Sequence, residues 1–364
     1  MADMLGYIIY GLIALSFLVL VHEYGHFLVA RLADVKVITF SLGFGKKLFK
    51  FNKGETEYAI SLVPLGGYVK LLGESENDEI KEEERHRSFA NKPPLTRILI
   101  AFSGPLFNML FALVLFFFIG IFGYTTLSSK VGEVSPGFPA EKAGIKSGDV
   151  ITSINGMDIR EYTDIMEAIE KSPLMPLEIR VRRNDQTLTF SIMPKEIEDR
   201  NIFGDTIRRK VIGISSSSEL IKQSQTLPGA FVYAGERVYF LTKMTLVGIG
   251  KLVTGSISPR KMLGGPLTIF KEAGKSAKTG LNGFITFVAF ISVSLGLMNI
   301  LPIPVLDGGH IILCLIEMAI GRKISEKAVG IAQNIGLVIL VSLMAFAFYF
   351  DIERMFDIGK FFGK

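Results

Sequence analysis

The chain has almost no cysteine, the residue that forms disulfide bonds and binds metals through its thiolate. Among its 364 residues there is one cysteine, Cys314, which lies in an apolar run. An intrachain disulfide and a zinc site built on cysteines are therefore both excluded. There are only four histidines, so a bound metal has to be held by histidine and carboxylate side chains.

Basic residues are absent from the start of the chain, and arginines form no clustered stripe elsewhere. The first four residues, Met-Ala-Asp-Met, contain no lysine or arginine, which argues against a cleaved signal peptide because such peptides begin with a basic region. The formal net charge is +5, but no arginine-rich stripe or nucleic-acid-binding motif accompanies it. We therefore expect no nucleic-acid partner.

Apolar residues dominate the chain. They make up 49% of it, more than is typical of a soluble domain of this length, so we expect an integral protein of the lipid bilayer. Four apolar runs approach or exceed the roughly 20 residues that a helix needs to cross a bilayer. They cover 5–33, 95–125, 281–320, which Pro302 and Pro304 interrupt, and 331–350.

Basic connections predict the orientation of these spans. The 34–94 loop and the 321–327 connection carry several lysines and arginines, which are enriched on the cytoplasmic side of membranes. Four spans place both connections on that side. The 126–280 region and both ends of the chain are then expected outside the cytoplasm.

The segment 228–254 is predicted to be an interfacial helix. Glu236, Lys243 and Lys251 recur at spacings of seven and eight residues, which puts charge on one stripe of a helix. Such a stripe favours a helix lying in the membrane interface over a span. A further crossing would also move the basic 321–327 connection outside the cytoplasm.

The first apolar run contains the pattern HExxH at His22-Glu23-Tyr24-Gly25-His26. On a helix the two imidazoles, four residues apart, share one face and can bind one zinc ion, while Glu23 is placed to deprotonate a metal-bound water. On a soluble helix the same pattern could be an exposed polar face. Within an apolar span, however, ionisable residues are expensive to bury and are expected to be functional.

A catalytic zinc ion needs a third protein ligand and an open position. The extended metzincin pattern would place glycine and histidine where Val29 and Leu32 stand, so it is excluded. Asp307 is a carboxylate in an apolar run, and Pro302 and Pro304 lie shortly before it. Broken backbone at membrane depth is tolerated where it lines a cavity, so we predict that Asp307 is the third ligand and that water reaches the metal there.

Two further histidines are weaker candidates. His310 lies three residues after Asp307 on the same helix face, so it is an alternative ligand, although a surface residue or a hydrogen-bond partner is the favoured interpretation. His86 lies in a charged loop and is expected to be solvated.

These motifs together resemble the site-2 protease family of intramembrane zinc metalloproteases, in particular the bacterial regulator-of-sigma-E protease group. The resemblance runs from about residue 5 to residue 350, and the joint occurrence of its motifs is specific. Besides HEYGH, it comprises FSLGFG at 40–45, PLGGYVK at 64–70, SFANKP at 88–93, SGPLFN at 103–108 and NILPIPVLDGGH at 299–310.

The resemblance implies a set of roles. His22, His26 and Asp307 would be the Zn2+ ligands, Glu23 the general base, and Asn299 a residue that binds or polarises the substrate backbone. Local capping of the broken helix is the alternative for Asn299. The activity implied is regulated intramembrane proteolysis in the bacterial cytoplasmic (inner) membrane, after a first cut, of the transmembrane segment of an anti-sigma factor or of a remnant signal peptide.

The expected fold is a polytopic α-helical membrane protein with about four transmembrane helices, a membrane-associated β-hairpin region and one inserted extracytoplasmic PDZ domain. The predicted regions are 1–125, with two spans and the hairpin loop 34–94, then 126–215, the PDZ domain, 216–280, a linker with the interfacial helix, and 281–364, with the last two spans. Two alternatives to a protease are a non-catalytic PDZ scaffold and a zinc transporter. The intact Glu23 argues against the first, and the single visible ligand set argues against the second.

The hairpin is predicted over 46–63, with its turn at Asn52-Lys53-Gly54. A helical substrate has to be unwound before cleavage, and an exposed strand edge could capture it by β-addition. The alternative is a purely structural hairpin.

Residues 131–214 resemble a circularly permuted PDZ domain. The signals are the segment AGIKSGDVI at 143–151, the turn Asn155-Gly156, a helix near 162–171, strands at 177–183 and 187–193, and a strand with its loop at 210–214. Such a domain would bind extended C-termini or exclude substrates that still carry a large ectodomain. The enterobacterial members of the group carry two such domains, whereas this chain has space for one.

Overall fold

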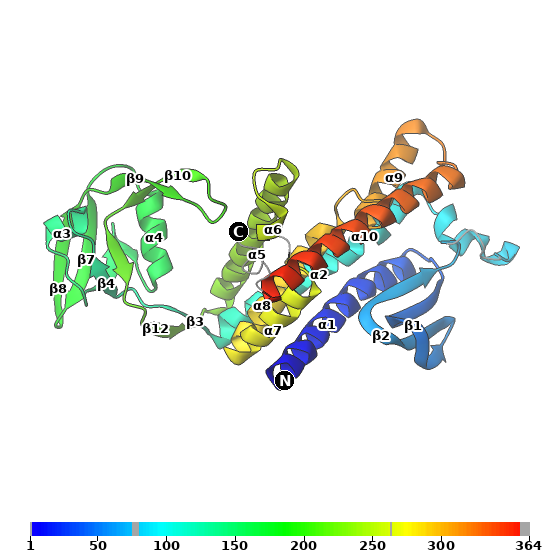
Figure 1. The fold of residues 1–364 in the computed structure, drawn as a ribbon, viewed down its shortest axis with the longest axis horizontal. Helices are drawn as coiled ribbons and strands as arrows, with labels where there is room; N and C mark the ends of the chain where they lie inside the picture. The colour runs from blue at the N-terminus through cyan, green and yellow to red at the C-terminus, as the bar shows by residue number, and fades with distance from the viewer. Residues whose placement is uncertain (1, 75–79, 263, 357–364) are drawn as a thin grey trace. The chain divides into compact units, whose positions relative to one another are not determined.

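The computed structural model describes residues 2–74, 80–262 and 264–356. The chain forms two compact units, Met1–Ile119 with Leu227–Lys364 and Gly120–Thr226 (Figure 1). The first unit is mainly helical and the second is built mainly from strands.

Among the residues that the structure describes, four helices are long and apolar enough to cross a membrane. The candidate spans are Met4–Leu32, Pro94–Phe122, Leu281–Asn299 and Lys327–Arg354. They lie in α1 (Ala2–Leu32), α2 (Pro94–Phe122), α8 (Leu281–Asn299) and α10 (Glu326–Phe356). The prediction of four spans is therefore confirmed in number and approximate position.

The third span is shorter than predicted. The apolar run 281–320 is not one interrupted span but two helices, because α8 ends at Asn299 and α9 covers Asp307–Ile320. Pro302 and Pro304, which lack a backbone N–H, lie in the connection and prevent a continuous helix. With 14 residues, α9 is about 21 Å long, too short to cross the roughly 30 Å hydrocarbon core.

In the described part of this unit, three further helices precede α8 in the chain. They are α5 (Leu227–Val253), α6 (Pro259–Met262) and α7 (Pro266–Lys278). The helix predicted over 228–254 is thus observed as α5, which is not among the candidate spans of the described residues. Its interfacial location stays a prediction. Buried Asp351 of α10 accepts hydrogen bonds from the backbone N–H groups of Leu267 and Thr268, which holds α10 against the start of α7.

A β-hairpin lies beside α1 (Figure 1). It consists of β1 (Val37–Lys53) and β2 (Thr56–Leu71), with Gly54 in the left-handed conformation at the turn. The predicted hairpin and its turn are confirmed, although the strands extend beyond 46–63. Two short 3₁₀ helices follow, Glu82–Arg87 and Phe89–Asn91.

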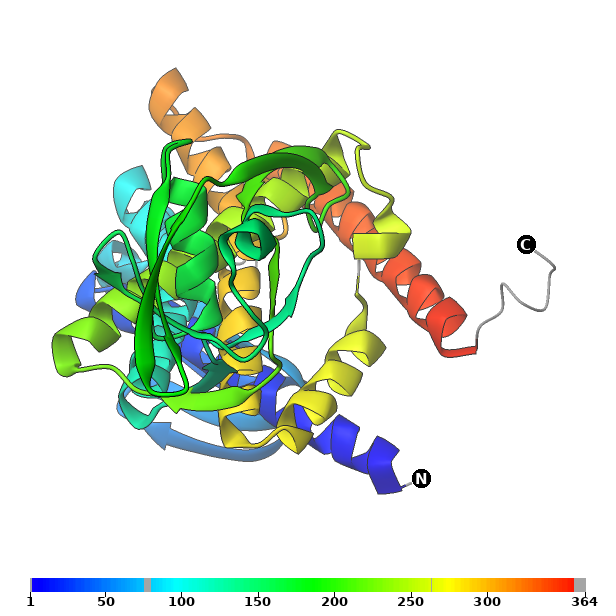
Figure 2. The same cartoon turned by 90° about the vertical axis from the view of Figure 1, so that its left-hand side faces the viewer.

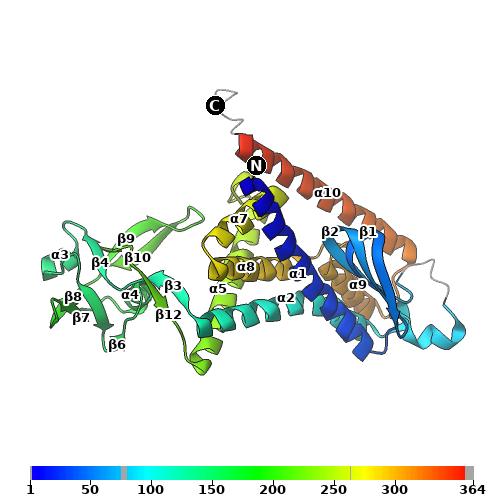
Figure 3. The same cartoon turned by 90° about the horizontal axis from the view of Figure 1, so that it is seen from below.

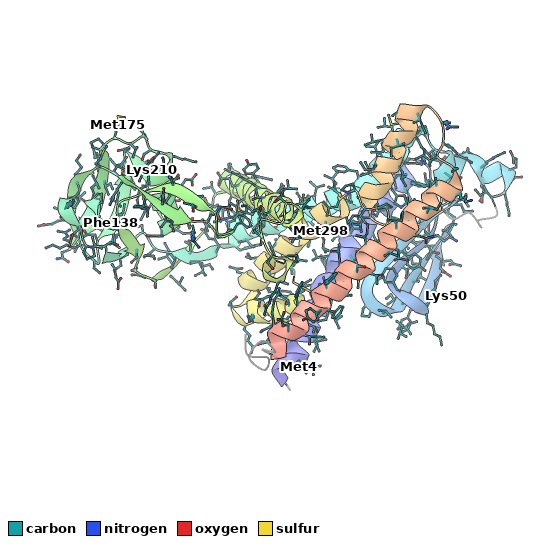
Figure 4. The ribbon with its side chains drawn as sticks, turned by 45° about the horizontal axis from the view of Figure 1, so that its top comes forward. Met4, Lys50, Phe138, Met175, Lys210 and Met298 are labelled. Carbon is teal, nitrogen blue, oxygen red and sulfur yellow. The ribbon has the colours of Figure 1, made fainter. Side chains whose placement is uncertain are left out.

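The two strands fold back on themselves to form four paired segments. Residues 39–42 pair with 67–70 on one side and with 57–60 on the other, and 47–53 pair with 56–61. The order across the sheet is therefore 47–53, 56–61, 37–42 and 67–71, with 67–71 at an edge. Lys50, at the opposite edge, is labelled in Figure 4.

The second unit, drawn mainly in green in Figure 2, has a four-stranded sheet in the order β6-β5-β7-β8. Its strands are β5 (Val150–Ile154), β6 (Met157–Asp158), β7 (Leu177–Arg183) and β8 (Gln186–Ile192). The unit has three further antiparallel strand pairs. In the first, β3 (Tyr124–Leu127) pairs with β12 (Leu220–Gln223), and in the second, β4 (Val131–Val134) pairs with β11 (Ile214–Ser216). In the third, β9 (Lys195–Arg200) pairs with β10 (Thr206–Val211).

The core of the second unit is formed by alternating apolar residues of the central strands and by its helices α3 (Pro139–Ala143) and α4 (Tyr162–Lys171). Leu177, Ile179 and Val181 of β7 are buried together with Ile165 of α4, while the intervening strand residues are exposed. The helix predicted near 162–171 and the strands predicted at 177–183 and 187–193 are observed within a residue of those positions.

Candidate metal centre

The two histidines of the HExxH pattern lie one helical turn apart on α1. Their rings are nearly perpendicular, and the two Nε2 atoms are 3.2 Å apart. Asp307, the first residue of α9, lies opposite them. Its Oδ2 is 3.1 Å from His22 Nε2, and its Oδ1 is 3.4 Å from His26 Nε2. Within the described part of the chain, these three residues are the one group that could hold a metal ion.

This arrangement fits a zinc ion. Zinc bonds of 2.0–2.2 Å place tetrahedral ligand atoms about 3.2–3.6 Å apart, which is close to the separations observed between the three side chains. Asp307 Oδ2 is buried and accepts no hydrogen bond. Several lone pairs that converge in a buried place repel one another unless a cation lies between them.

The tautomer of His26 is suited to metal binding. Its Nδ1 lies 2.8 Å from the Ile100 carbonyl oxygen on α2. Because a carbonyl can only accept, Nδ1 has to carry the proton, which leaves the lone pair on Nε2. This outward hydrogen bond also fixes the plane of the ring.

Glu23 and the metal-binding group line one cavity of about 290 Å³. Tyr68 and Val69 of the edge segment 67–71 line the same cavity, as does Val305. The strand approaches Glu23 closely. A methyl group at Gly67 would lie 3.3 Å from Glu23 Cγ and 2.8 Å from the Ser41 carbonyl oxygen, so glycine allows this contact.

Two glycines bring α1 and α2 together at the site. A methyl group on Gly25 would lie 2.6 Å from the Ser103 carbonyl oxygen, and one on Gly104 would lie 2.3 Å from His26 Nε2. Neither position has room for a side chain. Close approach through small residues is typical of packed membrane helices.

Asn299 is brought to the same site. It ends α8, next to Met298, which is labelled in Figure 4, and its Nδ2 lies 3.2 Å from His22 Nε2. The two glycines that follow Asp307 fold the 300–306 connection against the start of α9. Methyl groups there would lie 2.1 Å from the Ile300 carbonyl oxygen and 2.3 Å from the Ile303 carbonyl oxygen.

The other two histidines lie outside this group. His310 lines the cavity but does not belong to the metal-binding group. His86 is exposed, as predicted, and its Nε2 is 3.9 Å from Asp34 Oδ2.

Helix α2 contributes residues to the site that the sequence alone did not identify. Ile100 and Asn108 contact the histidines from this helix, and Gly104 makes room for them. Arg97 of α2 forms a buried ion pair with Glu317 of α9, which connects α2 to the helix that carries Asp307. The motif SGPLFN and the presence of arginine and glutamate in apolar runs were the available signals.

Comparisons with known proteins extend over most of the chain. The family model described as Peptidase family M50 matches residues 10–343. A candidate zinc metalloprotease of Campylobacter jejuni is 37% identical over 345 residues, which cover 94% of this chain and 92% of the relative. Zinc metalloprotease RasP of Oceanobacillus iheyensis is 29% identical over 416 residues, with 93% and 97% covered. Protease RseP of Yersinia pestis is 30% identical over 444 residues, with 94% and 98% covered.

These matches agree with the expected enzyme class. They confirm the family that the motifs suggested, the protease activity and the dependence on zinc. The chain belongs to peptidase family M50, the site-2 protease family, and is a zinc metalloprotease.

Proposed function

We propose that this enzyme hydrolyses a peptide bond within or next to the transmembrane segment of a membrane protein. The observation that carries the proposal is that His22 and His26, from one candidate membrane span, meet Asp307, which follows another candidate span after the 300–306 connection. A centre on such helices is suited to a substrate that enters from the bilayer. Cleavage there would complete a proteolytic pathway begun by a first cut.

In this proposal His22, His26 and Asp307 hold the zinc ion, and Glu23 is the general base. The bound ion would polarise the scissile carbonyl and acidify water. Glu23 takes a proton from the attacking water and delivers it to the leaving amine. Its location on α1, next to His22 and on the wall of the same cavity, supports this role.

Asn299 is proposed to bind the substrate backbone. Its amide lies beside His22 at the point where α8 ends. An amide N–H in that place can donate to a substrate carbonyl. If Asn299 only capped the end of α8, replacing it would not change substrate binding.

The edge segment 67–71 is proposed to hold the substrate in an extended form. Its Gly67 approaches Glu23, and the segment lies at an edge of the sheet formed by β1 and β2. Peptide groups on such an edge can form ladder hydrogen bonds with an added strand. The substrate would then be unwound where Glu23 can act on it.

The second unit is proposed to be a single, circularly permuted PDZ domain outside the cytoplasm, with the 34–94 loop inside. The observed order of its strands and helix α4 supports this assignment. The alignment with Protease RseP covers 444 positions, so this relative has at least 80 residues without a counterpart in the 364 residues here. That difference is compatible with one domain fewer. The proposed role of the second unit is either to bind substrate C-termini or to exclude bulky substrates.

The proposed substrates are an anti-sigma factor or remnant signal peptides in the bacterial cytoplasmic membrane, and the lipid bilayer is the medium in which the substrate is recognised. These substrates have in common one apolar helix left after removal of an ectodomain. Their cleavage would release a fragment to the cytoplasm.

The test is cleavage of a tagged transmembrane substrate by the purified full-length enzyme in detergent. Glu23→Gln should abolish cleavage, whereas Glu272→Gln, which changes an exposed glutamate of α7 paired with Lys275, should cleave like the wild type. Equal cleavage by Glu23→Gln would reject Glu23 as the base. Absence of cleavage by every form, with zinc bound, would favour a scaffold function for this chain.

A further inference from the structure

The side of His22 that faces away from the metal-binding group contacts one buried residue of α2. Asn108 is 1% exposed, and its Nδ2 lies 3.3 Å from His22 Nδ1. The other amide atom, Asn108 Oδ1, is also buried and has no hydrogen-bond partner. A buried polar atom of this kind requires a physical explanation.

The protonation of a zinc-bound histidine provides one. If His22 binds a metal ion through Nε2, its Nδ1 has to carry a proton and can only donate. An amide nitrogen facing it would then place two donors against each other. Turning the Asn108 amide by half a rotation exchanges its nitrogen and oxygen, which have nearly the same shape. Oδ1 then accepts from His22 Nδ1–H, which removes the opposition of two donors and gives the side-chain oxygen a partner.

We propose that Asn108 is a positioning residue for the metal centre, whose side-chain oxygen accepts the Nδ1–H of His22 and so fixes the tautomer and the ring plane of this ligand. This inference rests on the proposed assignment of His22 as a zinc ligand. It goes beyond that assignment because it adds a residue that does not touch the metal.

Asn108 is itself held rigidly. Ser292 of α8 is buried and donates a hydrogen bond of 2.7 Å to the backbone carbonyl oxygen of Asn108. On the next turn of α8, a methyl group at Gly296 would lie 3.0 Å from the Pro105 carbonyl oxygen, so the two helices are in close contact (Figure 3). The backbone of α2 at Asn108 is therefore anchored in a packed interface.

The same helix α2 orients both histidines. The Ile100 carbonyl oxygen accepts from His26 Nδ1, and Asn108, two helical turns further along, faces His22 Nδ1. Each imidazole thus has a partner on α2 for the nitrogen that points away from Asp307. Loss of such a partner typically weakens metal binding by about 10–100-fold.

The experiment is a zinc competition titration against a chromophoric chelator, with the full-length protein in detergent. Asn108→Leu keeps the shape but removes the acceptor, and we expect its zinc dissociation constant to rise by about 10–100-fold. Asn108→Asp keeps an oxygen acceptor and should bind zinc much more tightly than Asn108→Leu. Met109→Ala removes volume from the same α2 and α8 interface without changing a hydrogen bond to His22, and it should bind zinc like the wild type.

The outcomes separate this inference from the ligand assignment. The role of Asn108 would be overturned if folded Asn108→Leu bound zinc with wild-type affinity. It would also be overturned if Asn108→Leu and Asn108→Asp lost zinc affinity to the same extent. If Asn108→Leu does not fold, Asn108→Ala and Asn108→Asp provide the same comparison. His22→Ala is measured in parallel. If it too keeps full affinity, the ligand assignment itself fails, whereas loss of zinc in His22→Ala with full affinity in Asn108→Leu rejects only the role of Asn108.

Discussion

At the scale of single residues, the metal centre depends on a glycine that leaves space for the ligands, as well as on the ligands themselves. Gly104 faces both histidines, and a methyl group there would lie 2.3 Å from His26 Nε2 and 2.7 Å from His22 Cε1. Contacts this short force a displacement of the imidazoles or of α2. The geometry of the ligands is therefore set partly by the absence of a side chain.

Gly104→Ala should weaken zinc binding and destabilise the fold. Overpacking of a well-packed core typically costs about 1–3 kcal/mol, and here the displaced group is a proposed ligand. Zinc content after dialysis and the midpoint of thermal unfolding in detergent measure the two effects. Gly6→Ala is the matched control, because a methyl group at Gly6 in α1 meets no atom within 4 Å. Equal zinc content in the two variants would contradict this account.

The residues with distinctive chemistry could be predicted from the sequence. His22, Glu23 and His26 are recognisable from their spacing alone, and Asp307 stands out as a carboxylate in an apolar run. Asn108, Ile100 and Gly104 are not recognisable in this way. An asparagine, a carbonyl group and a glycine acquire a function only through the helix that faces them, which local periodicity does not reveal.

At the scale of secondary-structure elements, one buried ion pair connects the helices around the site. Arg97 of α2 and Glu317 of α9 are 13% and 9% exposed, and Glu317 also accepts the backbone N–H of Ile324. Because α9 begins with Asp307, this pair helps to position the third proposed ligand. The contact joins elements that are distant in sequence.

Glu317→Ala should destabilise the first unit by about 3 kcal/mol, because removing one partner leaves the Arg97 charge buried and unpaired. Zinc affinity should fall as well, since α9 would lose an attachment to α2. Denaturant unfolding in mixed detergent micelles measures the first effect. Glu272→Ala breaks an exposed pair with Lys275 and should change stability by about 1 kcal/mol or less. A result in which both variants unfold alike would argue against a structural role for the Arg97 pair.

In the second unit, an ion pair links the start of β5 to the end of β7. Burial alone would raise the pKa of Asp149, but hydrogen bonds from the Arg183 guanidinium and the Lys146 N–H outweigh it and hold that pKa below its usual range. Because the pKa is lower in the folded state, the stabilisation is present above the unfolded value of about 3.9 and is lost as the pH falls through the folded value.

Hydrogen exchange of the full chain measures this effect. Protection of β5 and β7 amides should stay constant from neutral pH to about pH 4 and then decrease, after correction for the intrinsic exchange rate. In Asp149→Asn, the protection of these amides should be lower over the whole pH range, and it should no longer fall below about pH 4. An unchanged decrease in the variant would assign it to other groups.

The elements themselves were largely predictable, but their pairing was not. Apolar length predicts the four spans, and the Gly54 turn predicts the hairpin. The division of β1 and β2 into four paired segments depends on Gly43, Gly45 and Gly66, whose positive φ angles let the strands bend. Such bends occur at few glycines, and the sequence does not mark which ones.

At the scale of the whole molecule, the second unit is inserted into the chain with its ends close together. Its entry strand β3 pairs antiparallel with its exit strand β12, and Tyr124 lies opposite Gln223. A unit with adjacent ends can be removed without stretching the chain on either side.

Replacing residues 129–218 by a short Gly-Ser linker therefore tests the proposed filter. The shortened enzyme should still cleave a substrate that has lost its ectodomain, because the metal centre is in the first unit. If the second unit excludes bulky substrates, the shortened enzyme should also cleave a substrate that keeps its ectodomain, which the complete enzyme should leave intact. Gel analysis of both substrates measures this. Continued resistance of the intact substrate would contradict the filter and favour binding of C-termini.

The proposed activity of the whole molecule depends on three side chains from α1 and α9 holding one metal ion. The most direct measurement is the zinc content of the purified protein by elemental analysis, compared with His22→Ala, Asp307→Ala and His310→Ala. We predict one zinc ion per chain in the wild type and in His310→Ala, which changes a cavity residue outside the metal-binding group, and substantial loss in the other two. Full zinc occupancy in both His22→Ala and Asp307→Ala would contradict the account.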